Sequence, residues 1–294
     1  MKPSNLLLFT PAFVLAAITI LYPFAVSLYI SVHDITPEGW VFAGPKHYVQ
    51  MLTNNVFYQS LLISVVYTLM SVFSALLLGL FTAMVVRELG RGRRIMEGLF
   101  AVPLAVSPIL VGIVWSPPAV WDDLNSLLYF SFNLPFIDVT DPTAYFPIMI
   151  LSEAWVWSPL FMLAVILVLD SLPRDCLEES QLVGASRLQM LTLVYLPADF
   201  RSRVIAMLVA LKSVDFFRAF EVPFAWSFWV RETQLGAPTD TLSLMLFKLL
   251  LTPPAGSAIP IPYISAVSTA LMLVSLTFSL LVFRQLSLFW RRTV

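Results

Sequence analysis

The sequence predicts an all-α integral membrane protein with six transmembrane helices, and three observations lead to that prediction. Hydrophobic residues make up 59% of the 294 positions and charged residues 12%, whereas a soluble domain has roughly 25% charged residues. The mean hydropathy is +0.86. Long stretches without Asp, Glu, Lys or Arg recur along the chain, at or above the length of about 20 apolar residues that a spanning helix needs. We therefore treat residues 1–294 as one transmembrane domain.

Apolar stretches along the chain mark the six helices. Five of them cover residues 3–33, 47–86, 98–121, 142–169 (interrupted by Glu153 alone) and 249–283. A sixth, at about 204–230, is apolar but carries four charged residues. The predicted helices lie near residues 5–30, 59–86, 96–117, 144–169, 203–229 and 262–284. The first is expected to be retained and not cleaved as a leader, because no small-residue cleavage site follows its apolar run.

The basic residues predict the orientation, because they concentrate in cytoplasmic loops. Most lie on one side of the predicted membrane: Lys2, Arg87, Arg91, Arg93, Arg94, Arg174, Arg187, Arg201, Arg203, Arg284, Arg291 and Arg292. Lys46, Arg231 and Lys248 lie on the other side. Both termini and the loop 170–202 are therefore expected in the cytoplasm. The loops near residues 31–57, 118–143 and 231–260 are expected to face outward.

Motifs of ATPases and hydrolytic enzymes are missing from the sequence. None of the glycines precedes a lysine, so the phosphate-binding pattern G-x-x-x-x-G-K-[ST] is absent, as are H-E-x-x-H and G-x-S-x-G. His33 and His47 lie in an outward loop without a cysteine nearby, which favours surface histidines over a metal site. The single cysteine, Cys176, excludes an internal disulfide. We predict that the chain is not an enzyme and binds no cofactor or metal itself.

The polar segment between the fourth and fifth predicted helices is expected to form two short helices. Pro173 ends the fourth helix, and Glu178 and Glu179 suit the positive end of a new one. Gly184 interrupts that helix. The second short helix carries apolar residues at helical spacing, namely Leu188, Leu191, Val194 and Tyr195. Such a helix pair suits a groove in a partner protein; an amphipathic connector lying on lipid headgroups is the alternative.

This segment resembles the EAA loop of the membrane subunits of binding-protein-dependent ABC importers. The family pattern is E-A-A-x-x-x-G-A, an apolar stretch and then L-P. The residues that match it in register are Glu178, Gly184, Ala185, Ser186, Leu196 and Pro197. Glu179 and Ser180 replace the two alanines, and Val183 replaces the usual acid. The resemblance implies that residues of about 171–200, Arg187 included, form a cytoplasmic coupling loop that docks on an ATPase.

Other fragments are similar to the sugar-type permeases, such as the first membrane subunits of maltose and glycerol-phosphate importers. In chain order they are Pro11, Tyr22-Pro23, 27–31, 44–48, Gly79-Leu80, Ala83, Pro103, Trp115, 155–159, Leu172-Pro173 and 217–221. The resemblance implies a permease subunit of an ATP-driven importer for a sugar or polyol, located in the inner (plasma) membrane.

The same resemblance implies the partners. They are a second permease subunit, two ATPase subunits that bind ATP and Mg, and an extracytoplasmic solute-binding protein; no nucleic acid is expected. An importer permease for a non-sugar solute such as an amino acid or phosphate is one alternative. An ion-coupled secondary transporter is another, because charged residues within a membrane often relay protons.

Charged and aromatic residues in the fourth and fifth predicted helices are candidates for the translocation path. Charges recur at every third position of the fifth helix, at Lys212, Asp215, Arg218 and Glu221. Neighbours three apart share a helix face, and charges at membrane depth must face a cavity or one another. They line the path or a gate, or they form a self-paired structural ladder. Glu153 is a candidate for the path or an interfacial acid, and Trp155 and Trp157 are candidates for sugar stacking or ordinary packing.

The outward loop after the fifth helix is expected to contact the solute-binding protein. Sugar-type permeases usually carry G-G-G-P there, followed by T-L-S. This chain keeps Thr241-Leu242-Ser243 and has lost most of the glycines. The resemblance implies contacts from Gly236, Pro238 and Thr241, on a surface of altered shape.

Overall fold

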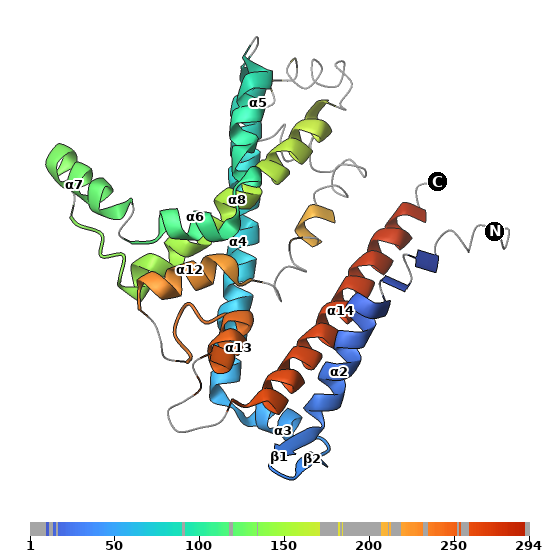
Figure 1. Ribbon diagram of the computed structural model, residues 1–294. Coiled ribbons are helices and arrows are strands. Elements are labelled where there is room, and N and C mark those ends of the chain that lie inside the picture. Colours follow the sequence, from blue (N-terminus) through green and yellow to red (C-terminus); the bar gives the residue numbers. More distant parts are fainter. Residues whose placement is uncertain are drawn as a thin grey trace.

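The structure is a computed structural model. It describes residues 17–89, 92–117, 120–133, 135–170, 219–231, 235–251 and 259–291, with positions 10, 11, 14, 15, 182, 184, 207–210, 212 and 253 between them. Within these ranges the chain is mostly helical, as predicted, and contains one two-stranded antiparallel hairpin. Figure 1 shows how the helices are arranged.

Three helices in the described part of the chain are long and apolar enough to cross a membrane. They are α4 (Asn55–Glu88), α8 (Pro142–Asp170) and α14 (Ile261–Arg291), and they correspond to the second, fourth and sixth predicted helices. The side chain of Asn54 accepts a hydrogen bond from the N–H of Val56 at 2.9 Å and so begins α4. Asp141 begins α8 in the same way, through the N–H of Thr143 at 2.8 Å.

The third predicted helix is present as a bent pair. α5 (Arg93–Ala101) runs into the 3₁₀ turn η2 (Val102–Ala105), and α6 (Pro108–Trp115) follows at an angle of 93°. Ser107 precedes a proline and has an extended backbone (φ −62°, ψ 133°), because proline disfavours a helical residue before it. The helix predicted near 96–117 is therefore not continuous, and the bent pair counts as one span at most.

The first predicted helix is seen as η1 (Ala17–Leu21), a π-helical turn, and α2 (Tyr22–Ser31), which are shorter than a full span in the described residues. α2 lies along α14 (Figure 1), where the Ser27 and Thr269 hydroxyls are 3.1 Å apart. A hairpin of β1 (His33–Thr36) and β2 (Gly39–Phe42) follows, and then α3 (Lys46–Thr53). Lys46 donates to Asp34 at 2.6 Å and lowers the pKa of that carboxyl.

The fifth predicted helix, 203–229, is interrupted at Ala219 and Phe220, which are not helical. In a continuous helix the carbonyl of Ala219 would accept the N–H of residue 223, but Pro223 has none. The Thr241 hydroxyl donates to that carbonyl instead, at 2.5 Å. α12 (Glu221–Trp229) follows the interruption. The described residues thus contain three spans, or four with the bent pair, where six were predicted.

Two shorter helices complete the described chain. α7 (Trp121–Phe132) ends at Asn133, which adopts a left-handed conformation (φ 52°). α13 (Leu242–Leu251) follows the outward loop and contacts α4 and α14. Figure 1 shows α7 at the periphery, beyond α6 and α12, while α13 lies beside α4.

The centre of the fold is the crossing of α4 and α8, which depends on one glycine. A Cβ atom at Gly79 would lie 2.6 Å from the Cβ of Phe161 and 2.8 Å from the carbonyl oxygen of Ser158. Real Cβ atoms do not approach so closely, so any side chain would push the helices apart. Gly112 allows a similar approach of α6 to α12, where a Cβ would lie 2.7 Å from the Cβ of Ala225.

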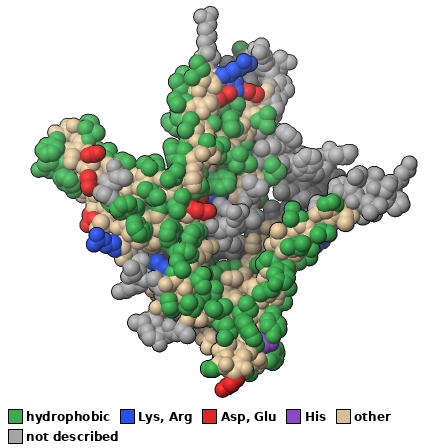
Figure 2. Space-filling model, in the orientation of Figure 1, with side chains coloured by type: hydrophobic (Ala, Val, Ile, Leu, Met, Phe, Trp, Pro, Cys, Tyr) green, Lys and Arg blue, Asp and Glu red, His purple; other side chains and the backbone are tan. Residues whose placement is uncertain are grey.

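The outer faces of the helices are apolar. Figure 2 shows hydrophobic side chains over most of the visible surface, while charged side chains gather mainly at its ends and in the outward loops. Exposed leucines include Leu28 on α2, Leu62 and Leu69 on α4, and Leu273 and Leu280 on α14. Surfaces of this kind suit lipid chains or another membrane subunit.

Candidate functional site

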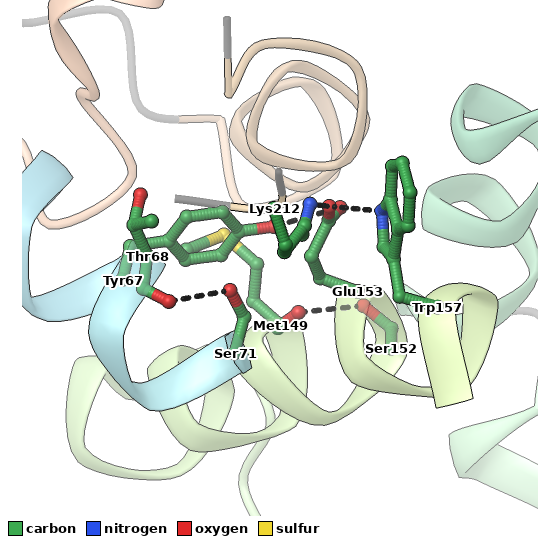
Figure 3. A network of polar contacts seen from close by, with 8 residues as sticks. All are labelled: Tyr67, Thr68, Ser71, Met149, Ser152, Glu153, Trp157 and Lys212. Atoms are coloured by element: carbon green, nitrogen blue, oxygen red, sulfur yellow. Dashed lines mark hydrogen bonds and ion pairs between the residues drawn. The ribbon is translucent and has the colours of Figure 1, made fainter. Parts of the chain in front are cut away.

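A buried ion pair joins α8 to the fifth predicted helix. The Nζ of Lys212 lies 2.5 Å from Oε1 of Glu153, and the two side chains are 5% and 10% exposed. The indole N–H of Trp157 donates to the same oxygen at 3.0 Å, and the Tyr67 hydroxyl donates to Oε2 at 3.2 Å. Figure 3 shows Lys212, Trp157 and Tyr67 converging on the Glu153 carboxylate. We call these four residues the Glu153 cluster.

Helical spacing and close packing bring the Glu153 cluster together. Glu153 and Trp157 are four residues apart on α8 and so share a face. Tyr67 comes from α4, where it is 1% exposed, and its neighbour across the interface is Met149 of α8. Lys212 also lies 4.2 Å above the centre of the Trp157 ring, within the range of a cation–π contact.

The Glu153 carboxylate is a buried charge, and both of its oxygens have hydrogen-bond donors. Moving two charges out of water costs several kcal/mol, about what a close ion pair with further hydrogen bonds returns. Here the carboxylate accepts from an ammonium, an indole and a phenol, and the ammonium faces an aromatic ring. The cluster therefore fixes α4, α8 and the Lys212 segment relative to one another.

The structure shows the positions of three of the charged residues that the sequence suggested for the translocation path. Glu153 is buried and is not an exposed interfacial acid. The partner of Lys212 is on another helix, which the three-residue spacing of the fifth helix did not suggest. Glu221 is exposed in the first turn of α12. Asp215 and Arg218 lie outside the described residues.

Two parts of the cluster could have been anticipated from the sequence. A single acid in the fourth span and a basic residue in the fifth suggest a pair, because each charge needs a partner at membrane depth. Tyr67 carries no such signal, since a tyrosine in an apolar span is usually packing. Trp155 is half-buried and lies against Trp115 with ring centroids 6.1 Å apart. The role of these residues in a translocation path stays a prediction.

The outward loop is organised by Asp240. Its Oδ2 accepts the backbone N–H groups of Gly236 and Ala237, at 2.9 and 3.3 Å, and its Oδ1 lies 2.5 Å from Nζ of Lys248. Burial raises the pKa of the Asp240 carboxyl, and the ion pair with Lys248 opposes that shift. Gly236 supplies the positive φ (82°) that the turn needs.

The three residues expected to contact a binding protein differ in exposure. Gly236 and Pro238 are half-buried, whereas Thr241 is buried within the chain. The Thr241 hydroxyl accepts from the N–H of Leu244 at 3.4 Å and thereby caps α13. A contact between this loop and a binding protein stays a prediction.

Of the predicted coupling loop, the structure describes Leu182 and Gly184. Gly184 is exposed, has a positive φ of 78°, and would place a Cβ in open space. This left-handed conformation agrees with a break between two helices. The remaining candidates lie outside the described residues: Glu178, Glu179, Ala185, Ser186, Arg187, Leu196 and Pro197. Within the described ranges, no three His, Cys, Asp or Glu side chains gather as a metal site.

Similar sequences are found among the membrane subunits of transport systems. The chain is 24% identical over 253 residues to a trehalose/maltose transport system permease protein of Thermococcus litoralis, covering 82% of this chain and 81% of that protein. It is 26% identical over 221 residues to a trehalose transport system permease protein of Mycobacterium tuberculosis, covering 73% and 70%. An sn-glycerol-3-phosphate transport system permease protein of Yersinia pestis is 22% identical over 196 residues, covering 65% and 66%.

Solved structures share the fold. A bacterial ABC transporter involved in the import of the acidic polysaccharide alginate matches with a TM-score of 0.75 over 99% of this chain and 96% of that chain, at 18% identity. The alginate transporter in complex with an alginate-pentasaccharide-bound periplasmic protein matches with a TM-score of 0.71, over 96% and 93%. No profile of a known protein family matches the chain. In sequence and in fold, the chain is similar to the permease subunits of sugar-type ABC importers.

Proposed function

We propose that this chain is a permease subunit of an ATP-driven ABC importer and forms half of the translocation pathway for a sugar or related polyol. The observation that supports this most is the agreement of a sequence comparison over 65–82% of the chain with a fold comparison over 99% of it. Permeases of trehalose, maltose and sn-glycerol-3-phosphate systems match in sequence, and an alginate importer matches in fold over 99% of the chain. The solutes in those names are all sugars or polyol derivatives.

The proposed assembly has two permeases, two ATPase subunits and an extracytoplasmic solute-binding protein. ATP and Mg bind to the ATPase subunits, since this sequence has no P-loop pattern. The periplasmic protein in the structure of the alginate transporter supports the binding-protein partner. The coupling loop, about 171–200, carries the permease side of the ATPase contact, and the loop 235–241 is a surface for the binding protein.

The proposed mechanism is alternating access. Closure of the ATPase dimer on ATP draws the 178–190 segments of the two permeases together, and the helices turn to face outward and receive solute. The change to the outward-facing conformation is driven by the tighter binding of ATP to that conformation. In this scheme the Glu153 cluster keeps the fourth and fifth helices together, because it joins the helix before the coupling loop to the helix after it.

The experiment is co-purification followed by transport. The tagged chain is isolated from its native membrane, its partners are identified by mass spectrometry, and the complex is reconstituted in liposomes with its binding protein. Uptake of trehalose, maltose, sn-glycerol 3-phosphate and alginate oligosaccharides is measured with and without Mg-ATP. We expect an ATPase, a second permease and a binding protein, and ATP-dependent uptake of at least one of these solutes.

Two other outcomes would change the proposal. ATP-dependent uptake of an amino acid or phosphate, with no uptake of the sugar panel, would keep the importer and replace the solute class. Isolation of the chain alone, with uptake that follows an ion gradient and needs no ATP, would replace the importer by a secondary transporter. The charged fifth helix would then be the first segment to mutate.

A further inference from the structure

A second polar contact lies where the proposed coupling loop begins. Arg93 is the first residue of α5 and Asp170 is the last residue of α8. The guanidinium of Arg93 binds both carboxylate oxygens of Asp170: Nη1 donates to Oδ1 at 3.2 Å, and Nη2 donates to Oδ2. Its Nε donates to Oε1 of Glu97, one turn along α5, at 2.6 Å. We call these three residues the Arg93 clamp.

The positions of Arg93 and Asp170 suit the dipole of the neighbouring helix and not the dipole of the helix that carries each residue. A basic residue at a helix N-terminus and an acidic residue at a helix C-terminus each oppose the dipole of the helix that carries them. In the pair, the Asp170 carboxylate lies at the start of α5 and the Arg93 guanidinium lies at the end of α8. Each charge therefore complements the dipole of the neighbouring helix, which favours this particular pairing.

An apolar cluster near the clamp joins the ends of α4, α5 and α8. It consists of Ala83, Val86, Met162, Val165 and Ile166, with Met96 of α5 packed against it. These residues come from the cytoplasmic ends of α4, α5 and α8 as the basic loops predict them. Contacts of α5 with α4 and with α8 bring these helix ends together, and Figure 2 shows acidic and basic side chains at that end of the molecule. The clamp thus adds a directional polar contact to a packed unit.

The clamp contributes little to folding stability, because its side chains are partly exposed: 29% for Arg93, 24% for Glu97 and 43% for Asp170. The two parallel N–H···O bonds from Arg93 to Asp170, which we call the fork, orient the two residues. They do so because they fix both the distance and the angle between the guanidinium and the carboxylate. The fixed point is Asp170, the residue directly before the coupling loop. A change in the direction of the chain at this point would be passed to α5 as well as to α8.

We propose that Arg93 is a positioning residue for energy coupling: it binds the first residue of the coupling-loop junction, Asp170, to α5, so that motion of the loop moves the third and fourth spans together. The proposal rests on the proposed function and adds a residue outside the loop itself. Without the fork, the loop could turn about the end of α8 while α5 stays behind. ATP would then be hydrolysed with less transport.

The test uses the whole reconstituted importer and the solute of the panel that the wild type takes up. Arg93→Gln and Asp170→Asn are compared with Arg94→Gln, which removes a neighbouring exposed arginine. We expect either clamp variant to lower the solute taken up per ATP hydrolysed by about five- to tenfold, the low end of coupling between distant sites. Arg94→Gln is expected to leave that ratio unchanged, and Arg93→Lys, which keeps charge but not the fork, to recover part of it.

The double variant Arg93→Gln with Asp170→Asn distinguishes an interaction between the two residues from two independent effects. If the residues act through each other, the double variant is no worse than either single one. Unchanged ratios in the clamp variants, or equal losses of uptake and ATP hydrolysis, would overturn the inference. A wild type that neither binds an ATPase nor takes up solute would instead refute the proposed function, so the two failures are distinct.

Discussion

Glu153 and Lys212 put one negative and one positive charge in a buried position between α8 and the fifth predicted helix. Each charge is held in place by the other and by neighbouring donors or rings, so neither can be removed in isolation at low cost. At the same scale, Gly184 has a backbone conformation that side chains rarely adopt. Substitutions at these positions test the buried ion pair and the backbone conformation of Gly184.

Removal of one member of the buried pair is expected to destabilise the protein strongly. Lys212→Met removes the ammonium that the Glu153 carboxylate binds, and Glu153→Gln removes the carboxylate that the ammonium binds. Breaking a buried pair from one side costs about 3–5 kcal/mol. The double variant removes both charges and is expected to recover much of that loss. Thermal unfolding of the purified protein in detergent measures all three, and additive losses would contradict the pairing.

Substitution at Gly184 is expected to uncouple transport from ATP hydrolysis while the protein stays in the membrane. A β-branched residue at positive φ strains the backbone, by about 1–2 kcal/mol. Gly184→Val should therefore change the turn between the two predicted short helices, although a Cβ at this position meets no neighbour within 4 Å. Gly184→Asn is the matched control, because asparagine tolerates the left-handed conformation. Normal uptake by Gly184→Val would count against the coupling role.

At the scale of elements, the packing of α4 on α8 depends on backbone approach and not on charge. The helix surfaces meet where Gly79 faces Phe161 and the Ser158 carbonyl. Contacts of this kind, with small residues at the crossing, are the main source of helix association in membranes, where burial from water contributes little. Both elements also carry members of the Glu153 cluster, so the crossing positions Tyr67 opposite Glu153.

Enlarging Gly79 is expected to separate α4 from α8. Gly79→Val would place atoms within 3 Å of the backbone of α8, which cannot yield as a flexible side chain would. Overpacking of this kind costs about 1–3 kcal/mol, or more where backbone must move. Gly98→Val is the control, because a Cβ at that position of α5 meets nothing within 4 Å. Less folded protein and a lower Tm for Gly79→Val alone would confirm the crossing.

At the scale of the whole molecule, the described helices have the apolar outer faces of a membrane protein. Hydrophobic side chains occupy much of the visible face between its two ends. The outward side, as the basic loops predict it, carries the β1–β2 hairpin and the loop 235–241. The opposite side carries the Arg93 clamp, and it is the side on which the coupling loop is predicted. This arrangement matches a subunit that meets different partners on the two faces of a membrane.

The predicted orientation can be tested with the single cysteine. A membrane-impermeant thiol reagent should label Cys176 in opened cells and not in intact ones, because the 170–202 loop is expected in the cytoplasm. In a Cys176→Ser background, Glu38→Cys in the exposed turn of the hairpin should be labelled in intact cells. The reverse pattern would show that the chain lies the other way across the membrane.

By itself, the sequence determined the membrane class, the positions of the second, fourth and sixth spans and the resemblance to sugar-type permeases. These rest on runs of apolar residues and on local motifs, which need no knowledge of contacts. Tertiary structure decided the angle of the bend at Ser107, the donor at the break at Ala219 and the contact of Lys212 with Glu153. The bend and the break each follow from a proline, but the angle and the substitute donor, Thr241, depend on what packs alongside. Lys212 binds a residue 59 positions away, and no spacing rule within one helix can identify a partner on another.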